Sequence, residues 1–200
     1  MILRESCIQD LPYIYDICLK TGNSGKDATE SFYDKNMLGS YYAAPYVVHS
    51  PEDCFVIVER GLISGYILST KDTNGFYTWL NNKWLPNIRE NYKENFEAKT
   101  EREKSLLNTI MKDTEMEKSL WIKEFPAHLH IDILANLQGK GAGKALMQRL
   151  FEHLKKNSVP GVHLGVDGAN ENAIGFYKKI GFEVLEKKDW GFILGYDLTK

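Results

Sequence analysis

Hydrophobic residues near the start of the chain recur at helical spacing. Leu11, Ile14 and Cys18 fall on one face of a helix for which Asp10 is a favourable N-cap, and Gly22 marks its end. The pattern therefore predicts an amphipathic first helix.

Two runs of apolar and β-branched residues follow, at 54–59 and 62–69, with Arg60-Gly61 between them. Such runs on either side of a glycine-containing turn are typical of an antiparallel β-hairpin. Less regular patterns predict a short strand at 2–5, a second helix at 31–38 ending near Gly39, and an aromatic loop at 41–46.

The second half of the chain alternates between strand and helix patterns. A strand at 128–134 leads into a glycine-rich stretch, and the next helix carries Leu146, Leu150 and Leu154 on one face. The remaining expected elements are a strand at 162–166, a helix from the N-cap Asn170 to about residue 180, and closing strands at 182–185 and 192–198. This β-α-β-α-β-β order predicts an α+β (mixed αβ) fold, in which helices flank a mixed sheet.

The segment 71–126 differs from the rest, because Trp79, Trp84 and Trp121 occur there among many lysines and glutamates. Several of its apolar residues repeat at helical spacing. We interpret the segment as a helical insertion within a single domain of residues 1–200, and we expect it to cap the fold rather than form a second domain. The tryptophans either pack this insertion onto the sheet or close over a substrate.

Composition excludes several classes of protein. The chain has 200 residues with a net charge of -2, which argues against the basic surface of a nucleic-acid-binding protein. Its cysteines are odd in number, Cys7, Cys18 and Cys54, and none form a CxxC pair, so we expect neither a metal site nor disulfides. We expect no signal peptide, no membrane span and a cytoplasmic location.

A glycine-rich stretch at 138–144 joins a predicted strand to a predicted helix. Glycines allow positive φ angles, and amides at a helix N-terminus favour an anion such as a pyrophosphate. The spacing fits neither a Walker loop, GxxxxGK(S/T), nor the dinucleotide pattern GxGxxG. It does fit the pattern (Q/R)xxGx(G/A), through Gln138, Gly141 and Gly143.

A second motif lies about thirty residues further on, where the sequence at 170–182 reads NENAIGFYKKIGF. In this order the two motifs resemble the CoA-pyrophosphate loop and the NxxAxxFYxxxGF motif of the GCN5-related N-acetyltransferase (GNAT) family. The segments 126–132 and 161–166 look like a subgroup of it. That subgroup includes bacterial acetyltransferases and the acetyltransferase-like domain of certain O-GlcNAc-removing hydrolases. The resemblance implies a mostly antiparallel central sheet flanked by helices, with the helical insertion placed before the central strand.

The resemblance also implies a cofactor, acetyl-CoA, with CoA as the product. Backbone groups near two strand residues would pair with the pantetheine arm, the loop amides would hold the pyrophosphate, and two further residues of the second motif would contact the cofactor. The cofactor-binding residues expected in this way are Ile133, Leu134, Gln138, Gly139, Lys140, Gly141, Ala142, Gly143, Lys144, Asn170 and Tyr177.

Acetyl transfer to an amine needs a base for the ammonium proton and an acid for the leaving thiolate. Tyr177 matches the family tyrosine that protonates the thiolate. His128, His130 and Asp132 alternate along one strand and share a face. His130 and Asp132 are therefore the candidates for the base, with Asp132 acting directly or orienting His130 or a water. Many relatives carry their base at the alternate positions of this strand, which point to the opposite face of the sheet. A β-bulge, which inserts one residue, would reset the register.

The predicted function is transfer of an acetyl group from acetyl-CoA to a primary amine on a small molecule or a protein. The alternative is a non-catalytic acyl-CoA-binding module. The resemblance places the acceptor near residues 20–39 and 41–46, and it suggests a homodimer.

Overall fold

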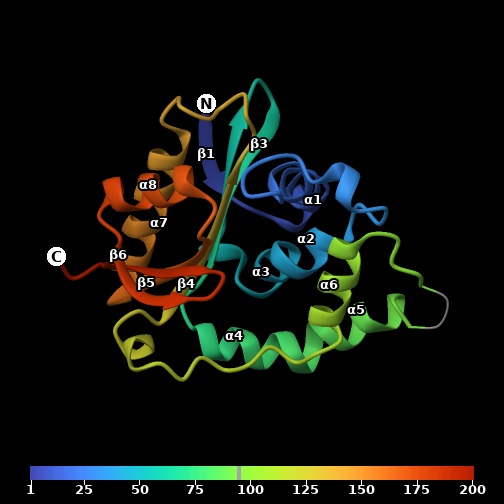
Figure 1. Ribbon diagram of the computed structural model, residues 1–200. Coiled ribbons are helices and arrows are strands. Elements are labelled where there is room, and N and C mark those ends of the chain that lie inside the picture. The colour runs from blue at the N-terminus through green and yellow to red at the C-terminus, as the bar shows by residue number, and fades with distance from the viewer. Residues whose placement is uncertain (94–95) are drawn as a thin grey trace.

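The computed structural model describes residues 1–93 and 96–200 and shows a central β-sheet with helices on both faces (Figure 1). The seven strands lie in the order β1-β2-β3-β4-β5-β7-β6, and only the β4–β5 pair is parallel. Their bounds are β1 (Ile2–Glu5), β2 (Phe55–Glu59), β3 (Leu62–Thr70), β4 (Ala127–Ile133), β5 (Gly161–Asp167), β6 (Glu183–Lys188) and β7 (Gly191–Asp197). The predicted α+β fold with a mostly antiparallel sheet is confirmed.

The two faces of the sheet bury separate hydrophobic clusters. Because successive strand residues point to opposite faces, Ile67 packs under α7 and α8, whereas Tyr66 and Leu68 pack under the other helices. On one face lie α7 (Ala142–Lys156) and α8 (Glu171–Ile180). On the other lie α1 (Leu11–Thr21), α2 (Met37–Tyr42), α3 (Ala44–His49), α4 (Thr73–Trp79), the π-helix η4 (Leu80–Trp84), α5 (Leu85–Asn91) and α6 (Glu101–Ile110). Short 3-10 turns complete the chain: η1 (Ile8–Asp10), η2 (Thr29–Ser31), η3 (Pro51–Asp53) and η5 (Leu120–Lys123).

The expected helix at 31–38 and the expected loop at 41–46 are wrong. Residues 29–31 form only a 3-10 turn, because the backbone of Phe32 is extended, with φ -133° and ψ 119°. Lys35 donates from Nζ to the carbonyls of Thr29 and Phe32. Asp34 Oδ1 accepts a hydrogen bond from the Asn36 amide, and α2 begins just after this turn. The predicted loop is instead the end of α2 and the start of α3, where Pro45 suits the first helical turn.

The tryptophans of segment 71–126 pack it against its neighbours. Trp84 donates from Nε1 to the Ser40 carbonyl of α2 at 2.8 Å and stacks on Trp79. Trp121 lies edge-on to His163 of β5, with ring centroids 4.7 Å apart. In the part of the chain that the structure describes, no helix is long and apolar enough to cross a membrane.

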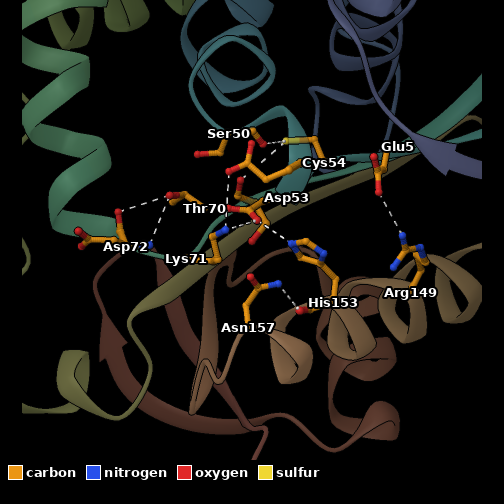
Figure 2. A network of polar contacts seen from close by, with 12 residues as sticks. Glu5, Ser50, Asp53, Cys54, Thr70, Lys71, Asp72, Arg149, His153 and Asn157 are labelled. Atoms are coloured by element: carbon orange, nitrogen blue, oxygen red, sulfur yellow. Dashed lines mark hydrogen bonds and ion pairs between the residues drawn. The ribbon is translucent and has the colours of Figure 1, made fainter.

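A polar network around the buried Asp53 joins α7 to the open end of the β2–β3 hairpin, away from its turn (Figure 2). Asp53 is fully buried before β2, and its Oδ1 lies 2.7 Å from Nε2 of His153 on α7 and 3.3 Å from Nζ of Lys71. Arg149 of α7 reaches Glu5 of β1. The network therefore ties α7, the helix that starts at the glycine loop, to β1 and to the residues that flank β2 and β3 at the open end of the hairpin.

Candidate functional site

Strands β4 and β5 separate soon after they meet. Each has seven residues, yet they pair only at Ala127↔Val162 and His128↔His163. On its other edge β4 pairs with β3 from Gly65↔Ile133 to Thr70↔His128. The strand residues beyond His128 therefore keep backbone groups on the β5 side that no ladder of the described chain uses. An extended ligand has room to pair in this gap.

The strand end next to the loop shows which backbone groups stay available. Leu134 donates its N–H to Ser64 at 3.0 Å and accepts from Leu137 at 2.9 Å, so both of its main-chain groups are engaged. Alternate residues of a strand point to opposite edges, so the N–H of Ile133 faces the gap. Its carbonyl accepts from the Gln138 side chain at 2.8 Å, which ties the loop to the strand.

The glycine loop forms an open cradle at the start of α7. Gly139 and Gly141 adopt φ angles of 72° and 83°, and a Cβ at either would meet no atom within 4 Å. In the described structure, five loop amides donate no hydrogen bond: those of Gly139, Gly141, Ala142, Gly143 and Lys144. Lys140 and Lys144 are exposed beside them. Free amides, a helix N-terminus and two cations suit a pyrophosphate.

Helix α8 closes against this cradle. A Cβ at Gly143 would lie 2.9 Å from the Phe176 ring, so only a glycine lets the two helices approach this closely. Asn170 caps α8 by accepting from the Ala173 amide at 3.2 Å. The N-cap predicted for Asn170 is confirmed, and Phe176 is a packing residue.

His128 is held by its neighbours on both ring nitrogens. Nε2 lies 2.6 Å from the Tyr46 hydroxyl and Nδ1 lies 2.9 Å from the Thr73 hydroxyl. Burial, with smaller contributions from His163 and His130, puts its pKa well below the usual value. A neutral imidazole with both nitrogens bonded has a structural role.

His130 lies further along the same face and forms no hydrogen bond to the described residues. Its ring lies edge-on to Tyr46 and Tyr42, at centroid distances of 5.3 and 6.1 Å. Burial, helped by His163, lowers its pKa to about 4. The ring is therefore neutral at physiological pH and can accept a hydrogen bond.

Asp132 faces Tyr66 directly across the β3–β4 ladder. The Tyr66 hydroxyl donates to Oδ2 of Asp132 at 2.6 Å. Burial raises the pKa of Asp132, and the hydrogen bond from Tyr66 opposes that rise. The ladder has no register shift, so the β-bulge considered from the sequence is absent between these two strands. Sequence reasoning missed Tyr66, because its register against β4 has no local signal.

Tyr177 of α8 is buried in the hydrophobic cluster under α7 and α8, with its ring 5.4 Å from that of Phe176 and 5.5 Å from that of Phe182. Burial raises its pKa strongly, and the charge of Asp132 raises it further. Its hydroxyl donates no hydrogen bond to any residue the structure describes. The opening between β4 and β5 is thus bordered by His130 and Asp132 of β4, and the glycine loop follows the end of that strand.

This fold and site define an acetyltransferase of the GNAT class, and comparison with known sequences agrees. The model of the Acetyltransferase (GNAT) family matches residues 24–182, so the chain belongs to this family. Acetyl-CoA is the acetyl donor of the family, whose members act on amine acceptors.

Particular relatives extend the comparison. The chain is 24% identical to protein O-GlcNAcase of Rattus norvegicus over 92% of its length, but spans only 20% of that relative. The solved structure of SsHAT superposes with a TM-score of 0.86 at 31% identity, covering 100% of this chain and 98% of that one. The PaiA N-acetyltransferase from Thermoplasma acidophilum, solved with coenzyme A, shares the fold with a TM-score of 0.57 at 15% identity and 98% coverage of each chain.

Proposed function

We propose that this chain transfers an acetyl group from acetyl-CoA to a primary amine, as one unit of residues 1–200 with 71–126 inserted. The observation that carries the proposal is the separation of β4 from β5 after two paired residues, with Asp132 on the open stretch of β4, beside a cradle of free amides. A potential base therefore lies on the strand along which the donor would pair.

The chain's own groups account for donor binding. The free amides of Gly139, Gly141, Ala142, Gly143 and Lys144 hold the pyrophosphate, with the ammonium groups of Lys140 and Lys144 beside it. The gap-facing edge of β4 near Ile133 pairs with the pantetheine arm. Bound acetyl-CoA supplies a thioester whose carbonyl carbon accepts the amine nitrogen and whose sulfur leaves.

Asp132 and Tyr177 divide the proton transfers. Oδ2 of Asp132 is held by Tyr66, so Oδ1 takes one proton from the incoming ammonium. When the C–N bond replaces the C–S bond, the sulfur gains a proton from the Tyr177 hydroxyl, and the second proton of the nitrogen restores that hydroxyl. One proton leaves to solvent in all. Neutralising Asp132 also removes its contribution to the raised pKa of Tyr177, which makes the phenol a better acid at the moment it is needed.

The decisive experiment is calorimetric titration of acetyl-CoA and CoA into wild type and Gly141→Trp. Gly61→Trp is the matched control, because Gly61 has a φ of 81° and equally open space in the β2–β3 turn. We expect micromolar binding by wild type and Gly61→Trp, and none by Gly141→Trp. No binding by folded wild type would refute the proposal.

A thiol-release assay with a panel of primary amines then tests turnover. Release of CoA that depends on the amine supports the enzyme. Binding of acetyl-CoA without turnover of any amine would favour the alternative, a non-catalytic acyl-CoA-binding module.

A further inference from the structure

Beyond the point where β4 and β5 separate, alternate residues of both strands still point to the same face of the sheet. Because His128 and His163 are paired and their rings lie 5.6 Å apart, every second residue onward shares that face. On β4 these are His130 and Asp132, and on β5 they are Gly165 and Asp167. The amine must approach the gap over this face, because it carries Asp132.

An exposed tryptophan covers the β5 side of this face. The carbonyl of Trp190, in the β6–β7 turn, accepts from the Gly168 amide at 3.0 Å, which fixes the turn to the end of β5. A Cβ at Gly165 would lie 2.9 Å from Cη2 of the indole. The far edge of the ring therefore occupies the space left by the missing side chain, and the residue is still 55% exposed.

A second exposed ring covers the β4 side. Tyr42, the last residue of α2, lies edge-on to His130 with centroids 6.1 Å apart and is 39% exposed. Each diverging strand is thus flanked by one aromatic ring that is open to solvent on the same face. The flat faces of exposed aromatic rings are suited to contact with a planar, apolar ligand.

The charge of this face is negative. Asp132 lies inside the gap, and Asp167 lies at its mouth, where Ser24 donates to Oδ2 at 3.4 Å. Within the described residues, no lysine or arginine forms an ion pair with either carboxylate. A cation is the ligand that these two carboxylates attract.

From these features we infer the acceptor class: a primary ammonium joined by a short alkyl arm to a flat aromatic ring. The ring lies against Trp190, the ammonium points to Asp132, and Gly165 sets the position of the indole. Trp190 is a specificity-determining residue, because it contacts the body of the acceptor and not its reacting nitrogen. Gly165 is a positioning residue that acts through the indole. The inference rests on the proposed acetyl transfer and adds the identity of its acceptor.

The test compares phenethylamine, cyclohexylethylamine and n-propylamine as acceptors for wild type, Trp190→Ala and Gly165→Ala. Trp190→Ala removes the ring, and Gly165→Ala displaces it with a single methyl group. For phenethylamine we expect both variants to raise KM about 3- to 10-fold, with kcat and the affinity for acetyl-CoA unchanged. For n-propylamine KM should not change, and Tyr13→Ala, another exposed ring, should behave as wild type.

Calorimetric titration of phenethylamine without acetyl-CoA keeps this inference separate from the proposed function. Weaker amine binding by Trp190→Ala supports the acceptor site even in a protein that fails to bind acetyl-CoA. The inference is overturned if wild type uses n-propylamine or a lysine peptide as well as phenethylamine. It is also overturned if neither substitution changes KM or Kd for the aromatic amine.

Discussion

The Tyr66 hydroxyl donates a 2.6 Å hydrogen bond to Oδ2 of Asp132 from the residue directly opposite on the neighbouring strand. Tyr66 is only 1% exposed, so water cannot replace this donor. The bond stabilises the charged form of a carboxylate whose pKa burial otherwise raises. It also fixes the carboxylate against β3.

Replacing Tyr66 by phenylalanine should move the activity profile to higher pH. Loss of a donor to the charged form raises the pKa of Asp132 further, so less of it is ionised as pH falls. The acidic limb of kcat/KM against pH should therefore shift upward, by about one unit for each 1.4 kcal/mol of lost stabilisation.

Tyr15→Phe is the control for this shift. It removes a hydroxyl bonded only to Ser40, at 3.2 Å, among the described residues. Its acidic limb should coincide with that of wild type. A Tyr66→Phe profile that lies on the wild-type curve would show that Tyr66 does not tune Asp132.

Local patterns in the sequence predicted most of the fold but few of the contacts between residues of the candidate site. The hairpin, the glycine loop and the Asn170 cap depend on residues close in sequence, and all three form as predicted. The contact between Tyr66 and Asp132 depends on strand register over 66 residues, which no local signal encodes. Helices α2 and α3 were missed for a similar reason. Their aromatic residues resemble a loop until the buried surface under them is known.

Asp132→Asn should stop turnover without destabilising the protein. The folded-state pKa of Asp132 is raised, so the charged form is the unfavourable one in the fold. Wild type then loses stability as pH rises through that pKa, whereas the amide has no charge to bury. At pH 7 we expect a Tm equal to or above wild type, and below about pH 3.8, where both side chains are neutral, the Tm advantage should disappear.

Thermal unfolding from pH 3 to 8, beside the thiol-release assay, measures both effects. A Tm for Asp132→Asn well below wild type at pH 7 would mean that the carboxylate stabilises the fold. Full activity in the same variant would remove Asp132 as the base.

Tyr177→Phe should lower kcat while leaving acetyl-CoA binding intact. The hydroxyl makes no hydrogen bond to a described residue, so its loss leaves no partner unpaired. General acid catalysis is typically worth about 100-fold or more, and kcat should fall by that order. Calorimetry should give an unchanged Kd for acetyl-CoA, and an unchanged kcat would exclude Tyr177 as the acid.

Asp53→Ala should destabilise the protein through the network that anchors α7. The carboxylate is fully buried beside His153 and Lys71 (Figure 2). Removing it leaves a half-buried imidazole without its partner and an ammonium with only the more distant Glu52. We expect a loss of about 2–4 kcal/mol in urea unfolding. Glu52→Ala is the control, since Glu52 is exposed and only 3.7 Å from the same lysine, and it should cost about 1 kcal/mol or less. Equal losses would mean that burial of Asp53 contributes nothing.

Two helical glycines near the cradle should respond to alanine in opposite ways. A Cβ at Gly143 would lie 2.9 Å from the Phe176 ring, whereas a Cβ at Gly175 would meet no atom within 4 Å. Gly175→Ala should stabilise the protein by about 0.5–1 kcal/mol through lower unfolded-state entropy. Gly143→Ala should destabilise it by about 1–2 kcal/mol, because the ring must move within a packed contact.

The double variant Gly143→Ala/Phe176→Leu identifies the cause of that loss. A smaller side chain at 176 makes room for the new methyl group, so the double variant should be about 1 kcal/mol more stable than the sum of the two single changes predicts. Urea unfolding of wild type, both single variants and the double variant completes the cycle. Strict additivity would mean that the contact between α7 and α8 does not require glycine at 143.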